Sequence, residues 1–167
     1  MARRPSETAS ALTYRTGVQD ANIAGNVHGG YLMKLCDDAA VIAATRLAGG
    51  RVVTAAVDAM KFKSPVHVGD LVTLRSQVNA AWNTSMEVGV RVEAENVVTG
   101  EIAHTCTAYL TMVALGEEGR PVPLPVVEPE SPDEIRRHRS AQRRRAIRIS
   151  DPDASLHIIS LREPPPT

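Results

Sequence analysis

A polar, glycine-rich loop runs directly into an apolar stretch that carries two acidic residues. The loop, residues 22–30, reads NIAGNVHGG, and Asp37 and Asp38 lie within the apolar stretch. Gly29 and Gly30 let a ligand approach the main chain closely, because neither residue has a Cβ. A helix that begins here presents unpaired N–H groups and the positive end of its dipole, which suit an anion or a polarised carbonyl oxygen. A carboxylate two turns further on would complete a site.

The two aspartates fall on different sides of the predicted helix, at about 100° per residue. Asp38 falls beside Lys34, one turn back, so we expect it to be a solvated partner of that lysine. Asp37 falls among apolar side chains such as Met33. A carboxylate among methyl and methylene groups is desolvated, which raises its basicity and suits a general base or a nucleophile. The alternative is a structural aspartate that accepts hydrogen bonds from a neighbouring loop.

Two polar side chains of the loop have two interpretations each. The Asn22 amide can hold a water molecule or a substrate oxygen, or it can make a local turn with Gly25. His28 can donate to a carbonyl oxygen, or it can cap the first turn of the helix. Asp37 lies about seven residues past Gly30, roughly 10 Å along a helix. A site shared between two subunits is one way to bring the loop and the acid together.

Composition excludes several classes of function. The 167 residues balance 19 Lys and Arg against 19 Asp and Glu, so the total charge favours neither nucleic acid nor a membrane surface. Aromatic residues make up 3%, too few for a base-stacking platform. No stretch approaches the ~20 apolar residues of a membrane span, and no apolar run follows the basic start. We therefore expect a cytoplasmic protein without nucleic-acid or membrane partners.

The sequence also lacks the patterns of cofactor and metal sites. His67 and His104 have no spacing to a Cys or Glu that would complete a ligand set, so we expect no metal. A P-loop, a dinucleotide fingerprint and a nucleophile elbow are absent from the sequence, and we expect no cofactor. Cys36 and Cys106 lie in apolar segments, which predicts two buried, reduced thiols.

The elements that must position these residues follow the order of one strand, one long helix and four strands. Residues 31–47 have apolar side chains at helical spacing, and Gly49 and Gly50 end the helix. Strands are predicted over 12–18, 51–63, 71–82, 85–97 and 101–115. In the fourth of these, alternation places Glu87 on the polar face. This order predicts an α+β fold, an antiparallel sheet wrapped around one helix, and dimerisation through the sheet.

These elements form one domain, residues 1–115, and the chain that follows it divides into three parts. Residues 116–132 are rich in proline and predict an extended linker. An arginine-rich helix is predicted over 133–149, since Ser131 and Pro132 are typical of a helix start. Residues 150–167 contain a short apolar piece at 156–161, to which we assign no role.

Several motifs in this order carry a family resemblance. They are Asn22, Gly25, the run VHGG at 27–30, Asp37, the run FKSPV with VGD over 62–70, and TSMEV at 84–88. The pattern resembles the hotdog-fold acyl-CoA thioesterases, and within them the cytosolic acyl-CoA hydrolase branch of brain acyl-CoA hydrolase and the bacterial YciA-type enzymes. The resemblance covers about residues 10–148. It implies a long helix wrapped by an antiparallel sheet, and hydrolysis of acyl-CoA to a fatty acid and free CoA.

The resemblance also implies roles for individual residues. Asp37 would be the base or nucleophile, and Asn22 would orient the water or the carbonyl from across a dimer interface. The N–H of Gly29 or Gly30 would stabilise the oxyanion. Contacts to the substrate and its CoA part would come from His28, Gly29, Asn83, Thr84, Ser85, Arg136, Arg137 and Arg139. Family members form dimers at the site and often hexamers overall.

Three other functions are compatible with parts of the pattern. One is another hotdog enzyme on acyl thioesters, such as a dehydratase or hydratase, but His28 lacks the matching acid that this chemistry needs. A second is an acyl-CoA-binding protein without turnover, which the presence of both Asn22 and Asp37 disfavours. The third is a nucleic-acid-binding protein that uses the arginine-rich helix, which the neutral total charge disfavours.

Overall fold

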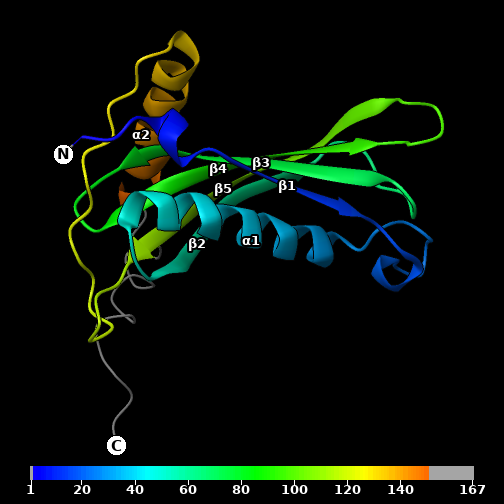
Figure 1. Ribbon diagram of the computed structural model, residues 1–167, viewed down its shortest axis with the longest axis horizontal. Coiled ribbons are helices and arrows are strands. Elements are labelled where there is room, and N and C mark those ends of the chain that lie inside the picture. The colour runs from blue at the N-terminus through cyan, green and yellow to red at the C-terminus, as the bar shows by residue number, and fades with distance from the viewer. Residues whose placement is uncertain (1, 151–167) are drawn as a thin grey trace, which may run out of the picture.

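The computed structural model describes residues 2–150, and its elements follow the predicted order (Figure 1). The strands are β1 (Ser10–Arg15), β2 (Val52–Phe62), β3 (Leu71–Ala81), β4 (Ser85–Glu95) and β5 (Ile102–Ala114), and the helices are α1 (Gly29–Ala48) and α2 (Pro132–Ser150). Short 3₁₀ turns span Pro5–Thr8 and Val18–Asp20. The tail predicted beyond residue 150, with its apolar piece at 156–161, lies outside the described residues.

The five strands form one antiparallel sheet in the order β1-β3-β4-β5-β2. Consecutive strands β3, β4 and β5 pair directly, as short connections favour, and β1 and β2 are the two edges. The helix α1 lies along one face, and α2 lies against the other (Figure 1). The predicted fold, a long helix wrapped by an antiparallel sheet, is confirmed.

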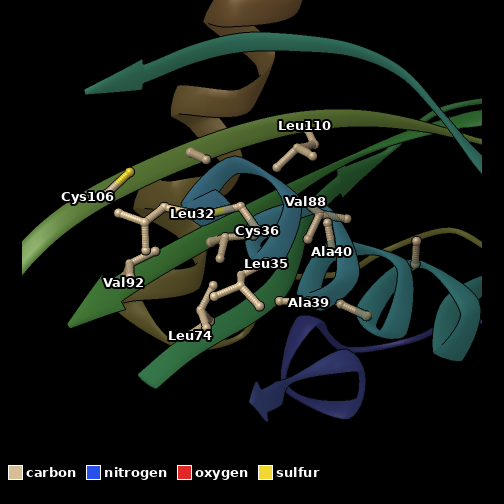
Figure 2. Packing of buried hydrophobic residues seen from close by; sticks show 14 of the residues in the cluster. Leu32, Leu35, Cys36, Ala39, Ala40, Leu74, Val88, Val92, Cys106 and Leu110 are labelled. Atoms are coloured by element: carbon tan, nitrogen blue, oxygen red, sulfur yellow. The ribbon is translucent and has the colours of Figure 1, made fainter. Parts of the chain in front are cut away.

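The core lies between α1 and the inner face of the sheet. Ala39, Ala40, Ala43 and Ala44 of α1 are all fully buried. Their small side chains let the helix approach the sheet closely, and leucines on either side fill the remaining space (Figure 2). A buried hydrogen bond of 2.7 Å from the Ser76 hydroxyl to the Ala39 carbonyl also joins the two layers. This packing fixes the rotation of α1, and with it the direction in which the acidic residues point.

The first strand ends earlier than the sequence predicts. We expected it over 12–18, but it spans Ser10–Arg15, and Val18 is 82% exposed in a 3₁₀ turn. The turn forms because the Asp20 carboxylate accepts a hydrogen bond of 2.8 Å from the Gly17 N–H. The apolar residue that prompted the longer prediction therefore lies at the surface.

Glu87 is not on a solvated face, contrary to the alternation argument. Its side chain is 0% exposed, because α2 covers this part of the outer face. Arg144 of α2 donates two hydrogen bonds to the Glu87 carboxylate, at 2.7 and 2.8 Å, and Asn79 donates a third at 2.9 Å. The same guanidinium lies 3.6 Å from the centre of the Tyr109 ring. A buried carboxylate persists here because its charge is paired and hydrogen-bonded.

The proline-rich segment between β5 and α2 is bound to the rest of the chain. Leu124 N–H donates to the Asn83 carbonyl at 2.8 Å, and Arg3 exchanges backbone hydrogen bonds with Val126 and Glu128. The Glu134 carboxylate of α2 then accepts hydrogen bonds from three backbone N–H groups, those of Ser6, Glu130 and Ser131. Within residues 2–150, no helix is long and apolar enough to cross a membrane.

Candidate active site

Asp37 and Thr54 meet at the edge of the core where α1 lies beside β2. The Thr54 hydroxyl donates a hydrogen bond of 2.5 Å to Oδ1 of Asp37 and lies 3.3 Å from the Met112 sulfur. Asp37 is half-buried, and Met33, one turn before it, is 46% exposed. The carboxylate is thus less enclosed in a single chain than its apolar neighbours predicted, because β2 is an edge strand that leaves this side of α1 open.

Asp38 takes the ordinary role predicted for it. Its carboxylate accepts a hydrogen bond of 2.7 Å from Lys34, and both side chains are exposed. The hydrogen bond and the charge of Asp38 raise the pKa of Lys34 above its usual range. The two adjacent aspartates therefore differ in surroundings, and Asp38 provides a matched control for Asp37.

His28 caps α1, which is one of its two predicted roles. Its Nδ1 accepts a hydrogen bond of 2.9 Å from the Gly30 N–H. The N–H of Gly30 is therefore engaged within the chain. Among residues 2–150, no acceptor binds the N–H of Gly29, at the first position of α1.

Asn22 makes a local turn and keeps its amide N–H₂ group available. Its Oδ1 accepts hydrogen bonds from the N–H groups of Ala24 and Asn26, at 2.9 and 3.2 Å. The side chain is fixed by these bonds, and Nδ2 remains a donor. In the described part of one chain, no hydrogen bond joins Asn22 to Asp37.

The predicted turn at 83–85 lies at the same end of the sheet as Thr54. Ser85 and Val53 both pair with Val113 of β5, from opposite sides. Two strand spacings, about 10 Å, therefore separate the turn from β2. The turn is also fixed through its backbone, since the carbonyls of Asn83 and Thr84 accept hydrogen bonds from Leu124 and Ala114.

The arginines of α2 divide into two groups. Arg144, Arg145 and Arg148 contact Glu87, the Trp82 ring and Asp58, respectively, and so attach the helix to the sheet. The three arginines predicted to bind CoA belong to the other group. Arg136 pairs with the exposed Asp133, and Arg139 is exposed.

Arg137 lines a hollow of about 640 Å³ on the outer face of the sheet. Its Nε is buried and has no hydrogen-bond partner among the described residues. Arg75, Arg91 and Arg136 line the same hollow. The hollow is therefore strongly basic, and it lies on the face of the sheet opposite to Asp37.

The two cysteines lie in the core, as predicted. Cys36 of α1 and Cys106 of β5 are 1% and 0% exposed, and both belong to the buried cluster of Figure 2. The neighbouring Cys106 thiol and burial raise the pKa of the Cys36 thiol well above its ordinary value. Neither thiol is placed to act as a nucleophile.

Sequence reasoning missed Thr54. It lies in a run of Val, Thr and Ala that predicts a strand but does not define which side chains face the helix. Its direction depends on irregular pairing between β2 and β5, with register shifts after Thr54 and after Val57. No local signal in the sequence marks these shifts.

Comparison with known proteins identifies the family. Residues 24–101 match the model of the thioesterase superfamily. The uncharacterized acyl-CoA thioester hydrolase YkhA of Bacillus subtilis is 40% identical over 138 residues, which cover 83% of this chain and 80% of that protein. This chain belongs to the thioesterase superfamily. The cytosolic acyl coenzyme A thioester hydrolase of Rattus norvegicus is 37% identical over 134 residues, but these cover 35% of its length.

Solved structures of other thioesterases share the whole fold. An acyl-CoA hydrolase from Staphylococcus aureus, solved with butyryl coenzyme A and coenzyme A, is 32% identical with a TM-score of 0.87, over 96% of this chain and 98% of that one. Alanine variants of the same enzyme at an aspartate, an asparagine and a threonine have also been solved. An apo hexameric acyl-CoA thioesterase is 36% identical with a TM-score of 0.84, over 87% and 93% of the two chains.

Proposed function

We propose that this thioesterase hydrolyses acyl-CoA to the free acid and CoA, with Asp37 acting on the thioester carbonyl. The observation that carries the proposal is the half-buried Asp37 carboxylate, oriented by a hydrogen bond from Thr54. The Staphylococcus aureus variants support it. In that enzyme the substituted asparagine and aspartate are as far apart in sequence as Asn22 and Asp37 are here. The aspartate and the threonine are likewise as far apart as Asp37 and Thr54.

As a general base, Asp37 would take a proton from the attacking water. Oδ1 accepts from Thr54, so Oδ2 is the oxygen left to receive that proton. The water oxygen bonds to the carbonyl carbon, and the C–S bond then breaks. The departing thiolate of CoA is a good leaving group, because an ordinary thiol has a pKa of about 8.5. The proton taken by Asp37 can return to this thiolate, so no separate strong acid is needed.

The negative oxygen that forms on the carbonyl requires donors. We assign the N–H of Gly29 and the amide of Asn22 to this role, because the Gly30 N–H already donates to His28. A donor of this kind contributes a factor of about 10² to 10³ in rate. The role of Gly30 would then be to fix the first turn of α1, through its hydrogen bond to His28, so that the Gly29 N–H points at the substrate.

A nucleophilic role for Asp37 gives a different isotope pattern when water attacks the aspartyl carbonyl of the intermediate. In a single turnover in ¹⁸O-labelled water, a general base places the label directly in the product acid. A nucleophile first forms an acyl-aspartyl anhydride, and its hydrolysis at the acyl carbonyl or at the aspartyl carbonyl decides where the label goes. Label in the Asp37 carboxylate after repeated turnovers would establish the nucleophile.

The activity test compares two adjacent aspartates. Release of free CoA thiol is measured for the wild type, Asp37→Asn and Asp38→Asn. Loss of general-base catalysis predicts a fall in kcat of about 10² to 10⁴ for Asp37→Asn, and a near-normal kcat for Asp38→Asn. A wild type that binds acyl-CoA without releasing thiol would overturn the proposed reaction and favour a binding protein.

We propose that the site is shared between two subunits that pair through β2. This strand is a sheet edge, and the nearby Met33, Val57 and Phe62 are between 45% and 51% exposed. Unpaired strand edges with apolar neighbours favour association. A second chain across this edge would also bring an Asn22 toward each Asp37. The hexameric relatives support a trimer of such dimers. Light scattering should then give a mass six times that of one 17.9 kDa chain.

Mixing two inactive variants tests the shared site. Random dimers of Asn22→Ala and Asp37→Asn chains contain about half mixed dimers, each with one intact site if residues come from both subunits. Activity would rise to about a quarter of the wild-type value after unfolding and refolding the mixture. No rise on mixing would place both residues of a working site in one chain.

We propose that the turn of Asn83, Thr84 and Ser85 contacts CoA. We also propose that the basic hollow, which faces away from Asp37 of its own chain, receives the phosphates of a CoA whose thioester lies at the site of another subunit. Guanidinium groups suit phosphate oxygens, and the unpartnered Nε of Arg137 supports a ligand there. In Arg137→Gln we expect KM to rise with little change in kcat. The KM of the variant should depend less on salt than that of the wild type. An unchanged KM would remove Arg137 from the CoA site.

A further inference from the structure

Strand β2 is attached to a different helix on each face of the sheet. On the inner face, Thr54 donates to Asp37 of α1. On the outer face, Nη1 of Arg148, in the last turn of α2, donates to both oxygens of Asp58 at 2.5 and 2.6 Å. The Arg148 and Asp58 side chains are only 12% and 14% exposed. The ion pair is therefore largely removed from solvent, unlike most arginine pairs on this surface.

Two bulges allow this double attachment. In a regular strand, residues four apart point to the same face. Thr54 and Asp58 point to opposite faces because the pairing of β2 with β5 skips Ala55, which reverses the alternation once before Asp58. The pairing then skips Asp58 itself. Each bulge leaves one residue without a partner, disrupts the ladder locally and increases the twist. Asp58 is thus a bulge residue whose side chain is fixed by α2.

Within one subunit, the register of this part of β2 depends on its pairing with β5 and on side-chain contacts. It is an edge strand, and in the described chain its ladder partner is β5. A shift of one residue would turn Thr54 away from α1. In contrast, α2 is anchored independently on β4 through Arg144 and Glu87, and on Trp82 through Arg145. Arg148 therefore connects a firmly attached helix to the bulged part of β2, where the ladder with β5 is interrupted.

We propose that Arg148 and Asp58 are positioning residues for the thioesterase reaction. Their ion pair fixes the bulged part of β2, so that the Thr54 hydroxyl stays in place and orients the Asp37 carboxylate. The inference rests on the proposed roles of Asp37 and Thr54. It gives α2, on the far face of the sheet, a part in catalysis that is separate from any contact with CoA.

The test is a double-mutant cycle in thiol-release kinetics. Arg148→Met keeps an unbranched apolar stem but removes the guanidinium and with it the ion pair, and Thr54→Ala removes the hydroxyl. We expect Arg148→Met to lower kcat about tenfold with KM within about twofold, because a small misplacement of a catalytic group is costly in rate. In the Thr54→Ala background, the same substitution should leave kcat unchanged, because its effect passes through Thr54.

Three further variants separate positioning from stability. Arg145→Met removes a neighbouring contact of α2, the one with Trp82, and should leave kcat unchanged. Arg148→Lys retains a cation and should recover part of the lost kcat. Arg148→Met with Asp58→Asn avoids an unpaired buried carboxylate. This pair should show the same low kcat in a folded protein, as verified by circular dichroism and light scattering.

The outcomes distinguish this inference from the proposed function. A normal kcat in Arg148→Met, or an equal tenfold loss in the Thr54→Ala background, would overturn the positioning role. A normal kcat in both Thr54→Ala and Asp37→Asn would instead overturn the proposed active site. An equal loss in Arg145→Met would show that α2 acts through general stability and would also reject the inference.

Discussion

Replacing Arg144 by Met is expected to be among the most damaging changes outside the active site. Arg144 donates two hydrogen bonds to Glu87, whose side chain is 0% exposed. The substitution leaves the volume of the side chain nearly intact but removes its charge. Of its hydrogen bonds within residues 2–150, the Glu87 carboxylate then keeps the one from Asn79.

The expected loss follows from the geometry of the pair. At about 4 Å between charge centres and an effective dielectric of about 20, the attraction is about 4 kcal/mol. Breaking a buried ion pair by removing one partner costs about 3–5 kcal/mol, since the remaining charge stays buried. The contact of Arg144 with the Tyr109 ring adds about 0.5–1 kcal/mol. We expect the free energy of unfolding to fall by about 3–5 kcal/mol.

The measurement is denaturant and thermal unfolding at one fixed protein concentration, because oligomer stability depends on concentration. The apparent melting temperature should fall by about 10 °C. Arg143→Met, at an exposed position of the same helix, is the matched control and should stay within about 0.5 kcal/mol of the wild type. The double variant Glu87→Gln, Arg144→Met removes both charges and should recover most of the loss.

The double variant decides whether the reasoning holds. If the unpaired carboxylate causes the loss, removing its charge must restore stability. A double variant as unstable as the sum of the two single variants would show that the charges are not the cause. A single variant no less stable than Arg143→Met would show that α2 is not anchored through Glu87.

Three further predictions concern other parts of the fold. In Gly89→Ala, the new Cβ would lie 2.7 Å from Nδ2 of Asn79 and break the hydrogen bond from Asn79 to Glu87. Urea unfolding should therefore show a free energy of unfolding lower by about 1–3 kcal/mol. The control is Gly50→Ala, whose Cβ meets open space and which should be close to neutral. Burial raises the pKa of Glu134, but hydrogen bonds from the N–H groups of Ser131, Glu130 and Ser6 outweigh it and hold the pKa below its ordinary value. The extra stability of the wild type over Glu134→Gln should therefore be complete at neutral pH and decline as the pH falls below about 4, since protonation removes it; a difference independent of pH would contradict this. Finally, Cys36 and Cys106 are buried, so an aromatic disulfide reagent should label neither thiol until the protein is unfolded. The same reagent can then report CoA release without a background signal from the enzyme's own thiols.

The sequence predicted the elements that have a strong local period. The α1 face with its alanines and leucines, and the alternation of β4, depend on side chains a few positions apart. The structure agrees with both, except at Glu87. The separation of Asp37 from Asp38 followed from the same helical period. His28 was limited to two roles by its place before the helix, and the structure shows the cap.

Contacts between distant segments were not predictable in this way. The alternation of its own strand predicts that Glu87 faces solvent. Its partner Arg144 lies far along the chain in α2, and the sequence does not predict which face of the sheet α2 covers. The arginines of α2 look alike in sequence, yet some bind the sheet and others line the hollow. Thr54 depends on bulges, which arise from the fit between two strands and leave no local pattern.

The hydrogen bond from the Ser6 N–H to the Glu134 carboxylate joins the first residues of the described chain to the start of α2. A deletion or a fusion partner that disturbs residues 2–8 would remove a donor from the start of α2, more than a hundred positions later. Removing Ser6 should then loosen the start of α2 and, if Arg148 acts as proposed, slow turnover. Affinity handles for purifying this enzyme therefore require a spacer before Arg3, whose backbone is already paired with the segment that leads into α2.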